Sequence, residues 1–214
     1  LEQRSTFEPS RSTRVFNISA RDAGAFILAP GMARRLEAEA PGIRIAWSQV
    51  QRGHISTELA SGRLDLAIDV ADLRGRDMES VELLATPYAC VMSRDHPRAG
   101  NVLTMEDFVA LRHVVVSSRR EGRSYVEEIA RAEGHRITPV MRLPHHMPAL
   151  EIVRRTHLVA TVPLPLAESS GLAVLPLPPV FPHLRSVLYW RRENAEDPAL
   201  AWLRDLVQQL AEAS

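Results

Sequence analysis

Residues 12–50, STRVFNISARDAGAFILAPGMARRLEAEAPGIRIAWSQV, decide the fold class of this chain. A β-branched and aromatic run at 15–18 predicts a strand, and turn and cap residues follow at 22–24. Apolar residues then recur at close to helical spacing over 26–36, until a Pro-Gly pair ends the pattern. Alternating apolar residues at 43–47 predict a second strand. This order predicts a βαβ unit, which requires a parallel sheet and a right-handed crossover.

A βαβ unit also directs the N-terminus of its helix toward the carboxyl edge of the sheet. Small ligands bind at that edge. The rest of the chain continues the alternation. Helices are expected at 52–61, 104–111, 124–133, 147–156 and 198–213, with a short one inside the Pro-rich stretch 163–182. Strands are expected at 64–69, 81–93, 113–117, 137–143, 158–162, 172–177 and 185–191.

Two of these strands indicate how the chain divides. The extended run 81–93 is too long for one small sheet, and 185–191 is its natural return partner. Together they predict two hinge strands between two Rossmann-like α/β lobes. Lobe I takes residues 12–87 plus 187–214, and lobe II takes 88–186.

Composition narrows the class of protein. The 214 residues carry a formal net charge of zero, and their acidic and basic residues are mixed along the sequence. A domain that holds DNA by itself usually has a basic face or stripe, which this composition does not indicate. Cys90 is the only cysteine, which rules out an internal disulfide and suits a reducing compartment. No apolar run approaches the roughly 20 residues of a membrane span. We therefore expect a cytoplasmic protein with no membrane partner.

Enzyme motifs are missing from the sequence. It has no nucleophile elbow, no dinucleotide-binding or P-loop glycine pattern and no His-Glu-x-x-His. Cys90 lies in a strand-like run, where a thiol is usually a small buried hydrophobe. We expect no catalysis and no cofactor.

Five segments, in this order along the chain, resemble the effector-binding domain of LysR-type transcriptional regulators. The first is the opening strand, helix and strand with its Ala-Pro-Gly. The others are SGRLDLAI at 61–68, RDHP at 94–97, LVATVP at 158–163 and DPALAWL at 197–203. The resemblance extends over residues 7–210, nearly the whole chain.

The resemblance implies a two-lobed fold like that of type 2 periplasmic binding proteins, with a small-molecule effector bound in the interlobe cleft. It implies a homodimer or tetramer in which helix 52–61 and strand 43–50 face helix 124–133 of the partner, burying Ile55, Leu59 and Ile129. The family's helix-turn-helix does not occur in these residues, so DNA would be bound only through an N-terminal domain outside them. Residues 1–11 would then be the tail of the linker to that domain.

Candidate ligand-binding residues begin where the first helix starts. Arg21, Asp22 and Ala23 form its opening turn. LysR-type regulators commonly have Ser or Thr at the position of Arg21, so here a cation would replace a hydroxyl and suit a carboxylate. The alternative is a surface arginine paired with Asp22 or Glu168.

Lobe II supplies the other candidates. Ser117 and Arg119 follow the valine-rich strand, where hydroxyl and guanidinium groups could hold an anion or form a solvated loop. His145 and His146 precede a helix. In aromatic-responsive members of the family, a histidine at the position of His145 lines the effector pocket. The alternative for His145 is a structural histidine. Neighbouring histidines on a strand end point in opposite directions, so we expect no metal site. Val162 and Pro163 end the next strand and would form an apolar wall.

The sequence therefore predicts the effector-binding and oligomerisation domain of a bacterial LysR-type regulator that senses a small organic, possibly aromatic, acid. The alternative is the solute-binding protein of a transport system, which has the same cleft.

Overall fold

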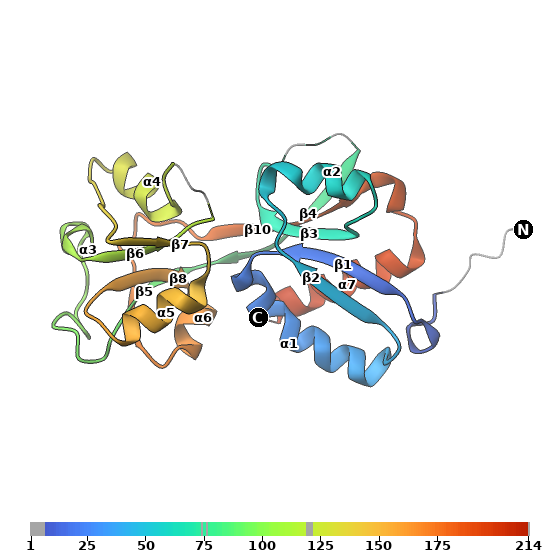
Figure 1. Ribbon diagram of the computed structural model, residues 1–214, viewed down its shortest axis with the longest axis horizontal. Coiled ribbons are helices and arrows are strands. Elements are labelled where there is room, and N and C mark those ends of the chain that lie inside the picture. Colours follow the sequence, from blue (N-terminus) through green and yellow to red (C-terminus); the bar gives the residue numbers. More distant parts are fainter. Residues whose placement is uncertain (1–6, 74, 76, 119–121, 214) are drawn as a thin grey trace, which may run out of the picture. The chain divides into compact units, whose positions relative to one another are not determined.

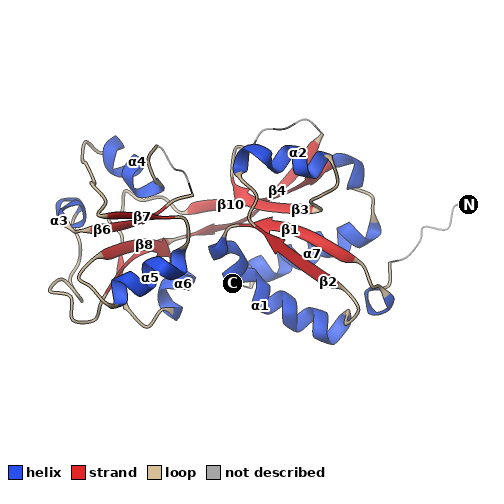
Figure 2. Ribbon diagram, viewed as in Figure 1, coloured by secondary structure: helices blue, strands red, loops and turns tan. Residues whose placement is uncertain are grey.

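The computed structural model describes residues 7–73, 75, 77–118 and 122–213. The chain forms two compact units (Figure 1). Unit 1 comprises Leu1–Ala85 and Arg185–Ser214, and unit 2 comprises Thr86–Leu184. Each unit contains a five-stranded sheet with helices on its faces (Figure 2). The predicted α/β class with two lobes is confirmed.

Unit 1 has the strand order β2-β1-β3-β10-β4. β1 pairs in parallel with β2 and β3, and β10 is antiparallel to β3. The strands are β1 (Val15–Ala20), β2 (Arg44–Ser48), β3 (Leu66–Val70), β4 (Met78–Thr86) and β10 (Leu184–Arg191). The helices are α1 (Asp22–Glu39), α2 (Ile55–Ala60) and α7 (Pro198–Glu212), with short 3-10 turns η1 (Pro9–Arg11), η2 (Arg52–His54) and η3 (Arg192–Asn194).

Unit 2 repeats this topology with the order β7-β6-β8-β5-β9. β6 pairs in parallel with β7 and β8, and β5 is antiparallel to β8 and β9. The strands are β5 (Tyr88–Met92), β6 (His113–Val116), β7 (Met141–Leu143), β8 (Val159–Pro163) and β9 (Ala173–Pro176). The helices are α3 (Met105–Ala110), α4 (Tyr125–Ala132), α5 (His146–Arg154) and α6 (Leu164–Ser169).

Three predicted elements differ from the observed ones. The extended run at 81–93 is two strands in different sheets, β4 and β5, separated at Pro87, whose nitrogen cannot donate to a ladder. The strand expected at 137–143 is formed only at Met141–Leu143, after a Thr-Pro pair. The helix expected at 52–61 is a 3-10 turn followed by α2.

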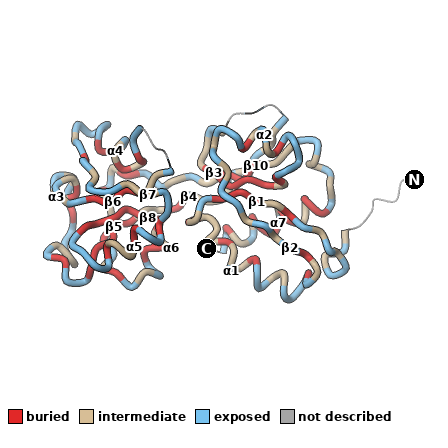
Figure 3. Tube along the Cα trace, viewed as in Figure 1, coloured by how far each residue is buried: buried red, intermediate tan, exposed pale blue. Residues whose placement is uncertain are grey.

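Apolar cores lie on both faces of each sheet, and the buried stretches in Figure 3 follow the strands and the inner sides of the helices. One core of unit 1 contains Ile55 and Leu59 of α2, which are 2% and 0% exposed. The expectation that they face a partner subunit is wrong, because they already pack against β3 and β10. Ile129 of α4 is half-buried against a core of unit 2.

Two glycines allow segments of unit 1 to approach closely. A Cβ on Gly42, in the turn before β2, would lie 2.5 Å from the backbone oxygen of Ser12. A Cβ on Gly31 of α1 would lie 2.7 Å from Cδ2 of Leu210 on α7. The Pro-Gly pair that ends the first helical pattern therefore also makes room for the segment before β1.

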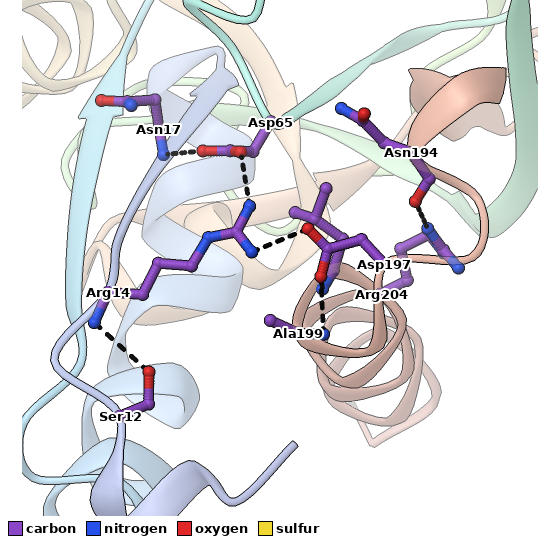
Figure 4. A network of polar contacts seen from close by, with 9 residues as sticks. Ser12, Arg14, Asn17, Asp65, Asn194, Asp197, Ala199 and Arg204 are labelled. Carbon is purple, nitrogen blue, oxygen red and sulfur yellow. Dashed lines mark hydrogen bonds and ion pairs between the residues drawn. The ribbon is translucent and has the colours of Figure 1, made fainter. Parts of the chain in front are cut away.

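A polar network joins the start of β1 to the start of α7 (Figure 4). Asp197 caps α7 by accepting hydrogen bonds from the backbone N–H groups of Ala199 and Leu200, at 2.9 and 3.3 Å. Arg14 donates to its other oxygen at 2.8 Å and lies 3.5 Å from Asp65. Asp65 in turn accepts the backbone N–H of Asn17 at 2.8 Å. The network fixes these three segments at the amino-terminal edge of the sheet.

Among the described residues, no helix combines the length and apolarity needed to cross a membrane.

Candidate ligand-binding site

In both sheets three neighbouring strands run parallel, β2-β1-β3 in unit 1 and β7-β6-β8 in unit 2. The carboxyl ends of these strands meet at one edge of each sheet, which is where open α/β sheets bind ligands. Predicted site residues lie at both edges. Arg21 follows β1, Ser117 follows β6, His145 follows β7, and Pro163 ends β8.

At the edge of unit 1, Arg21 precedes the first turn of α1 and is exposed. Its side chain makes no hydrogen bond or ion pair with the residues of unit 1 that the structure describes. Half-buried Asp22 accepts the backbone N–H of Ala23 at 3.0 Å through its Oδ1. The Ala23 N–H, one of the predicted donors for a ligand, therefore already has an acceptor.

An ion pair that the sequence analysis missed lies at the same edge. Arg52 in η2, just after β2, pairs with Asp69 of β3 with 2.9 Å between Nη1 and Oδ1. The Asp69 side chain is 5% exposed and the Arg52 side chain 29%. The sequence feature that could have indicated this ion pair is the carboxylate of Asp69 near the end of the buried strand LAIDV, because a buried charge requires a partner.

At the edge of unit 2, the loop after β6 is described only in part. Ser117 is half-buried, and its backbone N–H donates to the Leu143 oxygen at 2.8 Å, which extends the pairing of β6 with β7. Arg119 lies outside the described residues. Arg123 is exposed, with its Nη1 3.9 Å from Oε1 of Glu128. Both side chains are half exposed and the atoms are 3.9 Å apart, so this ion pair stabilises the fold little.

The two histidines differ in exposure. His145 is exposed at the N-cap position of α5, where its side chain makes no capping hydrogen bond. His146 begins the helix and is 8% exposed. The edge of unit 2 thus presents the first imidazole to solvent and buries the second.

The end of β8 is almost fully buried. Val162 is 0% exposed and belongs to a core of unit 2, so its side chain supports the strand end from inside. Pro163 is also buried, at the junction with α6. Thr161 is 8% exposed, and its hydroxyl has no hydrogen-bond partner among the described residues.

Cys90 and His113, which could in principle act as nucleophile and base, are buried in unit 2. Cys90 is 0% exposed, and burial raises the pKa of its thiol to about 12, as expected for a small buried hydrophobe. His113 is 1% exposed, and burial lowers its pKa although its Nε2 lies 2.7 Å from the Phe108 oxygen. Within the described part of the chain, no group of three or more His, Cys, Asp or Glu could hold a metal ion.

Two α/β units, each with three parallel strands ending at one edge, are the units of the type 2 periplasmic-binding-protein-like fold, and structural neighbours of the chain share it. A family model described as the LysR substrate binding domain matches residues 10–212. The chain therefore belongs to the LysR substrate-binding domain family.

Known proteins support this assignment. The transcriptional activator NahR of Pseudomonas putida is 30% identical over 214 residues, which cover 98% of this chain and 71% of NahR. The crystal structure of a probable transcriptional regulator from Pseudomonas aeruginosa has a TM-score of 0.85 at 31% identity, covering 95% of this chain and 69% of that one. The BenM effector binding domain with its effector benzoate has a TM-score of 0.73, covering 93% of this chain and 92% of that one; at 17% identity it shows the fold alone.

The chain is the effector-binding domain of a LysR-type regulator, because its homologues are transcriptional regulators and not enzymes. This finding favours the regulator over the transport protein. Regulators of this family bind small-molecule effectors, and they bind DNA through an N-terminal domain.

Proposed function

We propose that this domain senses a small organic acid with one carboxylate and a compact, possibly aromatic, body. The observation that carries the proposal is the exposed guanidinium of Arg21, which has no partner among the described residues of unit 1 and directly follows β1 at a ligand-binding edge. A guanidinium carries the charge opposite to that of a carboxylate, and the spacing of its N–H donors fits the two carboxylate oxygens. The N-terminus of α1 adds a positive dipole end beside it.

The edge of unit 2 would supply contacts for the rest of the molecule. The exposed imidazole of His145 can donate or accept a hydrogen bond to a ring substituent. Pro163, with Val162 packed beneath the strand end, offers an apolar element. We propose that one acid contacts both edges, and that its binding changes the orientation of the units and is transmitted through a homodimer to the DNA-binding domains.

The first test is a thermal-shift screen of small carboxylic acids, with benzoate among them, followed by calorimetric titration of Arg21→Ala and His145→Ala. A charge-assisted hydrogen bond contributes about 1.5–3 kcal/mol, so we expect Arg21→Ala to weaken binding by roughly ten- to a hundredfold. The exposed position predicts a change in stability within about ±0.5 kcal/mol. We expect His145→Ala to weaken a hydroxylated acid more than one without the hydroxyl.

Arg34→Ala is the matched control, since it removes an exposed arginine of the same helix twelve positions beyond its first residue, Asp22. It should leave affinity unchanged. If an acid binds and neither Arg21→Ala nor His145→Ala alters its affinity, the effector lies elsewhere. If no acid raises the melting temperature, the proposed ligand class is wrong.

A further inference from the structure

A second arginine reaches the carboxyl edge of unit 1 from the neighbouring strand. Arg52 follows β2, whereas its partner Asp69 belongs to β3, and β1 lies between these strands. In the register of β1 and β3, Ala20 pairs with Ile68, so Asp69 is level with Arg21. The segment after β2 contacts β1 here, because the Val50 N–H donates to Ser19 Oγ at 3.1 Å, and the Arg52 side chain then reaches Asp69 near the carboxyl end of β3.

The guanidinium of Arg52 is held in one position. Besides its bond to Asp69, Nη1 donates to the Val70 oxygen at 3.2 Å, and Nη2 donates to the Ala71 oxygen at 2.6 Å. Both carbonyls lie at or beyond the end of β3. Asp69 Oδ1 also accepts the backbone N–H of Val70 at 2.7 Å, so the carboxylate is fixed as well.

These contacts leave one side of the guanidinium unused. Arginine has five N–H donors in a planar fork, and the Nε–H of Arg52 has no acceptor among the described residues. The second proton of Nη2 is likewise left over. The Nε and Nη2 side of an arginine fits the two oxygens of a carboxylate, as Arg63 shows in this chain by donating from these atoms to Glu58 at 2.8 Å each.

We propose that Arg52 is a specificity-determining residue of this domain, and that its Nε–H and Nη2–H bind the carboxylate of the effector. The inference rests on the proposed function and deepens it, because it names the atoms that select an acid. Arg52 is already ordered by Asp69 and two carbonyls, so binding an anion costs it little side-chain freedom. Arg21, which no described residue of unit 1 holds, would have to be ordered and adds the second cation.

The test is calorimetric titration of sodium benzoate into the wild-type chain and into Arg52→Lys. Lysine keeps the charge and the pairing with Asp69 but lacks the two-donor side. We expect benzoate to bind the wild type and to bind Arg52→Lys roughly ten- to a hundredfold more weakly. Arg63→Lys, which removes an equivalent arginine before β3, should bind like the wild type.

Asp69→Asn separates recognition from support of the loop. It loosens Arg52 but keeps the guanidinium, so we expect a smaller loss of affinity than for Arg52→Lys. An equal loss in the two variants would show that only the pairing matters and would overturn the assignment. Unchanged benzoate binding by a folded Arg52→Lys, checked by its melting temperature, would overturn it while leaving the proposed function intact. If the wild type binds neither benzoate nor any other acid of the screen, both proposals are wrong.

Discussion

Arg14 stabilises unit 1 because it connects segments that are far apart in the sequence. Its guanidinium pairs with Asp197 at the start of α7 and lies 3.5 Å from Asp65 (Figure 4). It is also 4.7 Å from the ring centre of Phe16. Burial raises the pKa of Asp197, but hydrogen bonds from Arg14 and from the cap N–H groups outweigh it and lower the pKa overall. The carboxylate is therefore held in its charged form.

We expect Arg14→Ala to lower the free energy of unfolding by about 1–2 kcal/mol, because it removes a charge-assisted hydrogen bond and a cation–π contact from partly exposed positions. Chemical denaturation measures this change. Asp197→Asn is the comparison: an asparagine still caps α7, so it should cost less than Asp197→Ala, which loses the cap as well, about 0.5–2 kcal/mol. Equal costs for these two would contradict the capping role.

His113 predicts a dependence of stability on pH. Burial lowers its pKa from the usual 6.5, so protons bind more readily to the unfolded chain than to the folded one. The stability that neutral His113 supplies is therefore complete above pH 6.5 and is lost as the pH falls below that value. His96, whose pKa burial also lowers, acts in the same direction.

We expect the free energy of unfolding to fall as the pH drops from about 6.5 to about 5 in denaturant titrations. His113→Gln removes one of the two titrating groups and should make this fall shallower, even if it lowers stability at neutral pH. A steeper or unchanged decline in this variant would show that His113 is not responsible.

At the scale of elements, the close approaches at Gly42 and Gly31 predict that substitution by alanine is destabilising at the first position and tolerated at the second. At Gly42 a methyl group would meet backbone at 2.5 Å, so Gly42→Ala should destabilise by about 1–3 kcal/mol. At Gly31 it would meet the end of the Leu210 side chain, which can rotate, and alanine also favours helix by about 1 kcal/mol. Gly31→Ala should therefore be close to neutral, and denaturation curves of the two variants would show whether this order holds.

Elements were predictable where the local pattern and the packing agree. β1, α1 and β2 follow from apolar spacing together with turn and cap residues. Thr104 and Ser124 are the N-caps of α3 and α4, and both form capping boxes. The sequence predicts one strand over 81–93, because its apolar residues continue across Pro87. Its length already predicts that it serves both lobes, and only tertiary pairing shows that it breaks at Pro87 into two separate strands.

The candidate site was predictable in position but not in detail. Residues after a strand lie at a carboxyl edge by topology, which places Arg21, Ser117 and His145. Periodicity does not show that Val162 is fully enclosed or that Arg52 reaches Asp69, because both depend on contacts across strands. Side-chain pairing between segments was the missing information.

At the scale of the whole molecule, we expect a homodimer in solution. Ile55 and Leu59 cannot contribute to its interface, because unit 1 buries them itself. The edge strands β2 and β7 remain available, and Met141 on β7 is 42% exposed. Light scattering at about 50 µM, well above the dissociation constant of a standard-sized interface, should give twice the mass of the chain. A monomer at this concentration would contradict the expectation.

The division of the chain also has a consequence for its biosynthesis. Unit 2 is continuous in sequence, whereas the sheet of unit 1 needs β10 between β3 and β4, and its core needs α7. On the ribosome, the whole of unit 2 emerges before the last strand and helix of unit 1 exist. The first 85 residues therefore have an incomplete sheet during the time in which unit 2 is synthesised and can fold. A nascent chain that stops before residue 184 leaves the apolar faces of β3 and α1 uncovered, a surface that chaperones recognise.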